Sequence, residues 1–165
     1  MSTILATEPI LTRIEHAMYD LIGGMRLGTY NFDWGTVNQP DLAKVTFPSA
    51  LVVLEEEINM DEAGGAWSNG YLNQAIYIIT VRAKLNEEKH IPIFEIDAEL
   101  NKALDDLKKL FGSNYSVDGS CDRIMYRGMR RNMERTGDLF VPKSMETRWN
   151  VEYTQDRTTP TSFGQ

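Results

Sequence analysis

With 165 residues and a mass of 18.8 kDa, the chain is long enough for one domain with a sizeable core and too short for two such domains. Its 42% hydrophobic and 25% charged residues are ordinary for a soluble globular protein. The net charge of −7 argues against a general nucleic-acid binder, because such proteins carry a basic surface.

The first regular element is an amphipathic helix, predicted from about Thr7 to Leu21 with its end at Gly23–Gly24. Apolar residues recur there at spacings of three and four: Ile10, Ile14, Ala17, Met18, Leu21 and Ile22. The stretch from Gly28 to Ser49 has no clear period and is predicted to be a loop. Its aromatic residues, Trp34 among them, either tuck against the edge of the sheet or contact another subunit.

Two strands are predicted next, at Ala50 to Ile58 and at Tyr71 to Leu85. The second is apolar on both faces at its middle, which is typical of a strand inside a sheet, and it becomes basic at Arg82 and Lys84. The connection between the two strands is rich in glycine and asparagine and carries Trp67 near its tip. A contact with a partner is therefore expected at Trp67 and at the basic end of the second strand.

A second helix is predicted from about Glu95 to Phe111, with Gly112 as its cap. Asp122 to Arg135 fits either a helix or a strand, and Gly128 favours the strand, in which odd positions alternate arginine and methionine. Thr136 to Pro142 is then a loop. The last strand alternates strictly from Met145 to Thr154, as expected of a half-buried antiparallel strand.

The order of elements is therefore helix, strand, strand, helix, strand, strand. It predicts an α+β fold with an antiparallel sheet of about four strands and both helices packed on one face. Residues 1–155 are expected to form a single domain, and residues 156–165 a flexible polar tail.

Residues suited to catalysis or metal binding are few. His16 and His90 are the only histidines, and neither has a cysteine or second histidine at a metal-ligand spacing. Cys121 is the only cysteine, and the charge of Asp122 would raise its pKa rather than activate it. No catalytic, cofactor-binding or metal site is predicted, so the chain is not expected to be an enzyme. No apolar run approaches the roughly 20 residues that span a bilayer, so no membrane contact is expected either.

Five arginines gather in one short segment and form the most distinct charge cluster of the sequence: Arg123, Arg127, Arg130, Arg131 and Arg135. Up to Asp122 the chain has 19 acidic and 9 basic residues, whereas from Arg123 onward it has 5 acidic and 8 basic ones. The cluster is either a solvated strand face or a surface that forms ion pairs with the acidic part of a second copy. Contact with nucleic acid is a third interpretation, which the absence of interleaved exposed aromatics disfavours.

The series of elements also matches a known type of protein. The segments that carry the match are, in order, YNFDWGTVNQPD, FPSALVVLEEE, YIITVRAKL, AELNKALDDLKKLFG, MRRNMER and TRWNVEYTQDRTTP. The most telling is the closing strand with Trp149, Val151 and Tyr153 before a polar tail. In this order of elements the chain resembles the tail terminator proteins (also called tail completion or neck proteins) of tailed bacteriophages.

The resemblance implies a small α+β subunit that closes into a homo-oligomeric ring, expected to be a hexamer, on the last ring of tail-tube protein. Such a ring stops growth of the tube and presents a surface to the head-side connector, and DNA passes through its lumen without specific binding. Each subunit then needs two different surfaces that fit each other. The resemblance implies no active site and no cofactor, and it implies a place in the tail or neck of the virion after assembly in the host cytoplasm.

Two alternatives stay open. One is another head–tail connector component, such as a head-completion or stopper protein. The other, from a different class, is a small enzyme or a monomeric binding module that uses the arginine-rich strand.

Overall fold

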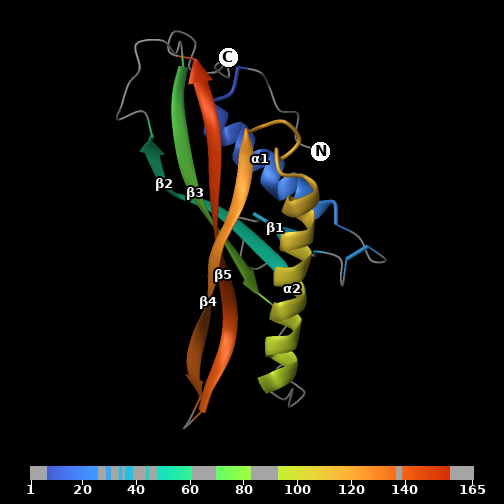
Figure 1. Cartoon of the computed structure of the whole chain (residues 1–165). Coiled ribbons are helices and arrows are strands. Elements are labelled where there is room, and N and C mark those ends of the chain that lie inside the picture. The colour runs from blue at the N-terminus through green and yellow to red at the C-terminus, as the bar shows by residue number, and fades with distance from the viewer. Residues whose placement is uncertain are drawn as a thin grey trace.

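A computed structural model describes residues 7–25, 29–30, 34, 36–38, 44, 48–60, 70–82, 93–136 and 139–156. The elements in chain order are α1 (Ile10–Gly23), β1 (Thr36–Val37), β2 (Ser49–Asn59), β3 (Gly70–Arg82), α2 (Ile93–Ser113), β4 (Arg123–Thr136) and β5 (Leu139–Asp156). The strands form one sheet in the order β1-β2-β3-β5-β4, and both helices lie on the same side of it (Figure 1). The predicted α+β fold and its element order are confirmed.

Every pair among the four long strands is antiparallel. The exception in the sheet is β1, a two-residue strand parallel to the start of β2. It lies inside the stretch predicted to be a loop without regular structure. Asn38, which follows β1, takes a positive φ of 50° and exchanges two side-chain hydrogen bonds with the backbone of Val52. Asparagine tolerates this conformation, and its side chain continues the hydrogen bonding to β2 beyond the end of β1.

Helix α1 packs its apolar stripe on the sheet, and Ile10, Ile14, Ala17, Met18 and Ile22 are buried as predicted. Pro9 is the N-cap of this helix. The N–H of the C-cap Gly24 donates to the carbonyl of Asp20 at 2.9 Å and ends the helix where predicted.

Helix α2 is longer at both ends than predicted. It begins at Ile93 and continues through Gly112 to Ser113, whose hydroxyl donates to the carbonyls of Lys109 and Leu110. Gly112 is therefore not the cap, because a side-chain hydroxyl satisfies the last carbonyls instead. Its buried side includes Leu110 and the acidic Asp106.

In β3 the odd positions from Asn73 to Val81 are buried against the helices, whereas Tyr71 at the start of that face is exposed. Ile76 on the other face is buried as well, as expected of a strand inside a sheet. The hydroxyl of Tyr77 donates to the carbonyl of Leu11 at 3.0 Å, which ties the centre of the sheet to α1. The strand as described ends at Arg82, and the predicted end at Leu85 lies outside the described residues.

The ambiguous segment after Asp122 is a strand, β4, and it forms a long hairpin with β5. The predicted loop from Thr136 to Pro142 is wrong, because Thr136 pairs with Leu139 and leaves only residues 137–138 between the strands. Pro142 lies opposite Met133 beside a register shift, a place where a strand tolerates a residue without an N–H. Asp156, expected to open the tail, is the last residue of β5 and pairs with Gly70. The remainder of the predicted tail lies outside the described residues.

Trp149 stands at the centre of the core. It is 2% exposed and packs edge-to-face on Phe111 of α2, with 4.9 Å between the ring centroids. Its indole N–H donates to the hydroxyl of Thr147 at 2.8 Å, and that hydroxyl donates to the carbonyl of Ile79. The buried indole of Trp149 and the buried hydroxyl of Thr147 therefore both have an acceptor, as a stable core requires.

Candidate interaction surface

The face of the sheet that the helices do not cover is called here the open face. Register places on it the even positions of β3 and β5, such as Ile78 and Arg148, because the odd positions face the helices. The two halves of this face differ in chemistry. The half formed by β2 and β3 is mostly aliphatic, and the half formed by β5 and β4 carries charged pairs.

Three ion pairs lie on the open face. Two of them join neighbouring strands, and the third reaches over one strand. Arg123 holds Glu152 through two hydrogen bonds of 2.7 and 3.2 Å, and Arg130 holds Glu146 at 2.7 Å. Arg148 reaches across β3 to Glu55 of β2 at 3.1 Å. Asn132 also donates to Glu146 at 2.9 Å, and this bond together with Arg130 lowers the pKa of the Glu146 carboxyl. These arginines are therefore matched to carboxylates of their own chain.

Arg131 belongs to the other side of the sheet. Tyr126 pairs with Trp149 and Gly128 pairs with Arg148, so Arg127 is an extra residue, a β-bulge. After the bulge the odd positions face the helices, and Arg131 donates to Asp97 of α2 at 3.0 Å and also to Asn101. The predicted arginine cluster is thus not a single surface. Arg130 and Arg131 are neighbours in the strand and face opposite sides, and the bulge places Arg123 on the face opposite to Arg131.

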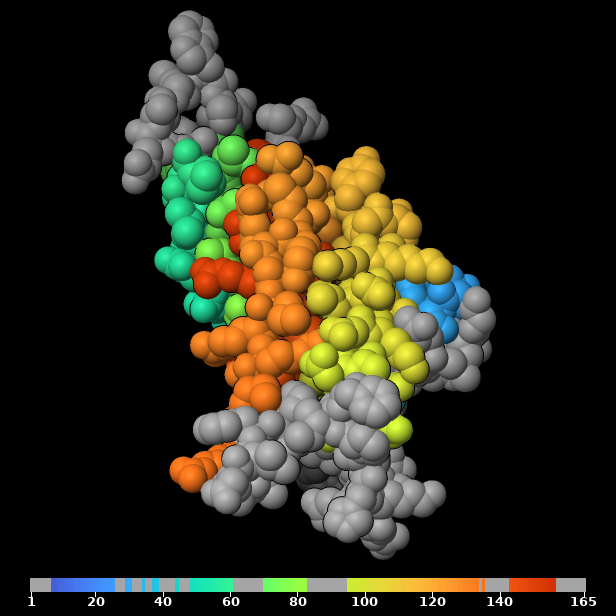
Figure 2. All heavy atoms as spheres, turned by 60° about the horizontal axis from the view of Figure 1, so that its bottom comes forward, coloured from blue at the N-terminus to red at the C-terminus, as the bar shows by residue number. Residues whose placement is uncertain are grey.

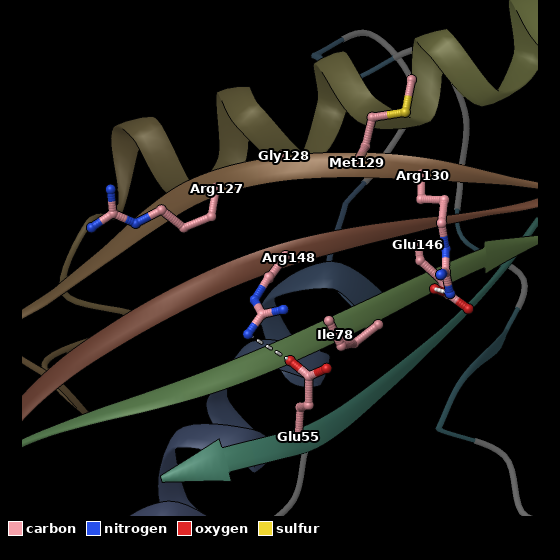
Figure 3. Close-up of a pocket in the computed structure, with 8 residues that line it drawn as sticks. All are labelled: Glu55, Ile78, Arg127, Gly128, Met129, Arg130, Glu146 and Arg148. Carbon is pink, nitrogen blue, oxygen red and sulfur yellow. Dashed lines mark hydrogen bonds and ion pairs between the residues drawn. The ribbon is translucent and has the colours of Figure 1, made fainter. Parts of the chain in front are cut away.

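A hollow of about 340 Å³ lies on the open face around this bulge. Its lining comes from all four long strands: Glu55, Ile78, Arg127, Gly128, Met129, Arg130, Glu146 and Arg148. Gly128 has a φ of 135°, and a Cβ placed on it would meet no atom within 4 Å, so the space above it is open. Figure 3 shows Ile78 on the floor between the two ion pairs, Met129 pointing toward α2, and Arg127 pointing away from both pairs.

Arg127 is the arginine of this strand with no carboxylate partner among the described residues. Its guanidinium makes a long contact of 3.9 Å with the sulfur of Met125. At the β2 side of the sheet, an acidic side chain lacks such a partner among the described residues. Glu55 pairs with Arg148 and Glu57 accepts a hydrogen bond from the hydroxyl of Tyr153, but the exposed Glu56 between them has no such partner in the described part of the chain.

Aliphatic side chains are exposed on the β2 side of the open face. This aliphatic strip consists of Leu51, Val53, Ile58 and Leu72. Leu51 and Val53 are each nearly half exposed, at 48% and 46%. Exposed apolar side chains that gather on one face of a protein can mark a contact with a partner.

The other residues predicted to contact a partner are placed as follows. Trp34 is in the core, 7% exposed, and its indole N–H donates to the sulfur of Met25. Of the two interpretations of Trp34, packing within its own subunit is therefore the correct one. Arg82 is exposed at the end of β3, and Arg135 is exposed near the tip of the second hairpin. Trp67 and Lys84 lie outside the described residues, and their role stays a prediction.

The groups with perturbed pKa values do not form a reactive site. Burial, and then the charge of Asp122, raises the pKa of the Cys121 thiol to about 12, so the thiol is protonated at neutral pH. Burial likewise raises the pKa of Tyr77 and of Tyr153, and Glu57 adds to the shift of Tyr153. Among the described residues no group of histidine, cysteine, aspartate or glutamate side chains could hold a metal ion. Within the same residues, no helix has the length and apolar character to cross a membrane.

Two features of this surface, the bulge in β2 and the aliphatic strip, leave a pattern in the sequence. Glu55, Glu56 and Glu57 are three consecutive acids in one strand. Such a run cannot lie on one face, and the structure places a bulge there, with Leu54 opposite Tyr77 and Glu56 opposite Ile76. The aliphatic strip was also visible, since Leu51 and Val53 alternate with the buried Ala50 and Val52.

Comparison with known proteins adds no identification. No protein-family model matches the chain, and no curated protein matches it significantly in sequence.

Proposed function

We propose that this chain is a structural subunit of a phage virion, a tail terminator or neck protein that forms a ring on the tail tube. The ring, which the resemblance gives as a hexamer, caps the tube and joins it to the head-side connector. DNA passes through its lumen without specific binding. Assembly takes place in the host cytoplasm, and the finished ring lies between the tail and the head.

The observation that carries the proposal is the uncovered aliphatic strip on the open face. Both helices pack on the opposite face, so Leu51 and Val53 remain in water in the isolated chain. Covering apolar area gains roughly 25 cal/mol per Å², which favours a subunit that associates through this face. Glu55 and Glu56 lie between Val53 and Ile58 on the same strand, so the apolar parts of the strip have charged residues beside them, as in an interface that combines apolar and polar contacts.

The resemblance in element order turns this general expectation of association into a specific one. A tail terminator has no chemistry to perform, and its function is the geometry of its contacts with copies of itself, with the tube and with the connector. A surface of aliphatic residues and ion pairs suits that role.

Purified protein examined by native mass spectrometry and negative-stain electron microscopy tests the proposal. We expect rings of one defined size, and we expect added rings to bind the end of assembling tail tubes and to stop their elongation. Rings that form but leave tube elongation unchanged would favour a different connector component. A chain that stays monomeric at high concentration, with or without tail-tube protein, would refute the proposal.

A further inference from the structure

Within the described part of the chain, two strands have outer edges that pair with no other strand over most of their length. Along β2, Asn38 caps the edge at Val52, and beyond Val52 the described residues place no strand against it. Along β4, the N–H of Ile124 donates to the carbonyl of Tyr115, and the described chain places no strand beside the remainder of this edge. In Figure 2 the described part of β4 lies at the surface, with α2 on one side and with β2 and β3 on the other. Free strand edges are templates for pairing with another strand.

The directions of the strands make the two edges compatible with each other. The order β2-β3-β5-β4 is antiparallel at every step, so β2 and β4 run in opposite directions. When identical copies are placed side by side in the same orientation, β2 of one copy therefore meets β4 of the next as an antiparallel neighbour. The sheet continues across the junction, and the helices of both copies stay on the same face.

The charges of the two edges are opposite. Glu55, Glu56 and Glu57 lie on β2, and the arginines of β4 lie on the other edge. A two-fold dimer would pair each edge with itself and would set acids against acids or arginines against arginines, which is destabilising. The mixed pairing sets acids against arginines, so the charges favour a head-to-tail contact over a closed two-fold one.

Glu56 and Arg127 lie on the same face of the sheet. Glu56 pairs with Ile76 in the ladder, which places it on the open face, and Arg127 lines the hollow on that face. In a sheet continued from one copy to the next, both side chains would project to the same side of the junction. Opposite charges on neighbouring strands attract when they are directly or diagonally opposite.

We propose that copies of this chain associate by antiparallel pairing of β2 in one copy with β4 in the next, with Glu56 facing Arg127 across the junction. This contact is the subunit junction of the ring, so it rests on the proposed function. The partner that fits this surface is a second copy of the same chain, and the bond between copies is a strand ladder flanked by an ion pair.

A charge exchange tests the junction. Glu56→Arg alone and Arg127→Glu alone should each lower the association constant about 3- to 10-fold at low salt and less at high salt. The double variant Glu56→Arg/Arg127→Glu restores the opposite charges at unchanged net charge and should recover association. Asp105→Arg, an exposed position on α2, is the control for the change in net charge and should leave association unaltered. Failure of the double variant to recover would overturn the pairing.

The charges and the bulge could instead protect the edges from pairing, and one variant decides between the two roles. Glu56→Ala/Arg127→Ala removes both charges and should weaken association if they hold the junction. Stronger association of this variant would overturn the proposal.

Cysteine cross-linking identifies the strands that meet. In a Cys121→Ser background, the double variant Glu56→Cys/Arg127→Cys should form disulfide-linked ladders longer than dimers, and neither single cysteine variant should cross-link. Dimers from a single variant would show two-fold pairing and overturn the junction. Rings that persist without ladders would overturn the junction and leave the proposed ring intact. Ladders from open chains, without rings, would support the junction and count against the ring.

Discussion

Replacing Arg131 by glutamate tests how the bulge at Arg127 assigns side chains to the two faces of β4. In the structure Arg131 is 14% exposed and donates to Asp97 at 3.0 Å and to Asn101, so its replacement acts inside the subunit. Arg127 lies only four positions earlier but has no carboxylate partner among the described residues. The variant Arg127→Glu is therefore a matched control with the same change in charge.

The expected loss can be worked from these contacts. A hydrogen bond to a charged group contributes about 1.5–3 kcal/mol, and the lower end applies because Asp97 is 47% exposed and screened by water. Glutamate at position 131 adds repulsion with Asp97 of about 1 kcal/mol at a separation near 4 Å in a water-like dielectric. Arg131→Glu should therefore lower the free energy of unfolding by about 2–3 kcal/mol, and Arg127→Glu should change it by less than about 0.5 kcal/mol.

Urea unfolding followed by tryptophan fluorescence measures both changes, because Trp149 is buried between Phe111 and Tyr126. The protein concentration should be low enough to keep the chain monomeric, so that association does not add to the measured stability. The Arg131→Glu midpoint should fall by about 1 M or more of urea. Restoring the pair as Arg131→Glu/Asp97→Arg should recover part of the loss. Equal effects of the two reversals, or a neutral Arg131→Glu, would refute the assignment of faces.

Three further outcomes are expected. Cys121 should react with a thiol reagent far more slowly in the native chain than in urea, because it is buried and its pKa is raised to about 12; equal rates would contradict that burial. Gly128→Ala should lower the free energy of unfolding by about 1–3 kcal/mol, because it forces a side chain into a φ of 135°. Gly112→Ala inside α2 should raise the free energy of unfolding by up to about 1 kcal/mol. The reverse ranking in the same urea assay would contradict both assignments. The folded state holds the pKa of Glu146 below its ordinary 4.5, so its contribution to stability is complete above pH 4.5 and is lost as the pH falls through the lowered pKa. Glu146→Gln should then lose less stability than the parent chain on acidification below pH 4.5, and parallel curves would argue against this role.

The parts of the fold that could be predicted are those where one local pattern decides burial. Strict alternation from Met145 to Thr154 specified β5, because only one face of that strand is apolar. The spacing of Ile10, Ile14 and Met18 specified α1 for the same reason. The predicted ends of α2 and the predicted loop between β4 and β5 were less accurate, since capping by Ser113 and the tolerance for Pro142 depend on neighbouring backbone rather than on the pattern itself.

The candidate site could be predicted only in outline. The sequence indicated an arginine cluster, but the faces of its members depend on the extra residue Arg127, which shifts the alternation in the middle of β4. Partners are set by contacts between distant segments, as between Arg131 and Asp97 or between Arg148 and Glu55. Trp34 was ambiguous because a loop aromatic can fill either a core or an interface, and only the packed fold shows which.

The bulge in β4 also determines where this strand can change in length. Tyr126 faces the helices and Gly128 faces the open side, so these two residues already alternate correctly when Arg127 is removed. Deletion of Arg127 would therefore leave every other side chain of β4 on its present face. Deletion of a residue elsewhere in the paired part of the strand would turn one side of it over and place apolar residues in water. Insertions and deletions among related chains are thus expected to collect at Arg127, and for the same reason at Glu55 in β2.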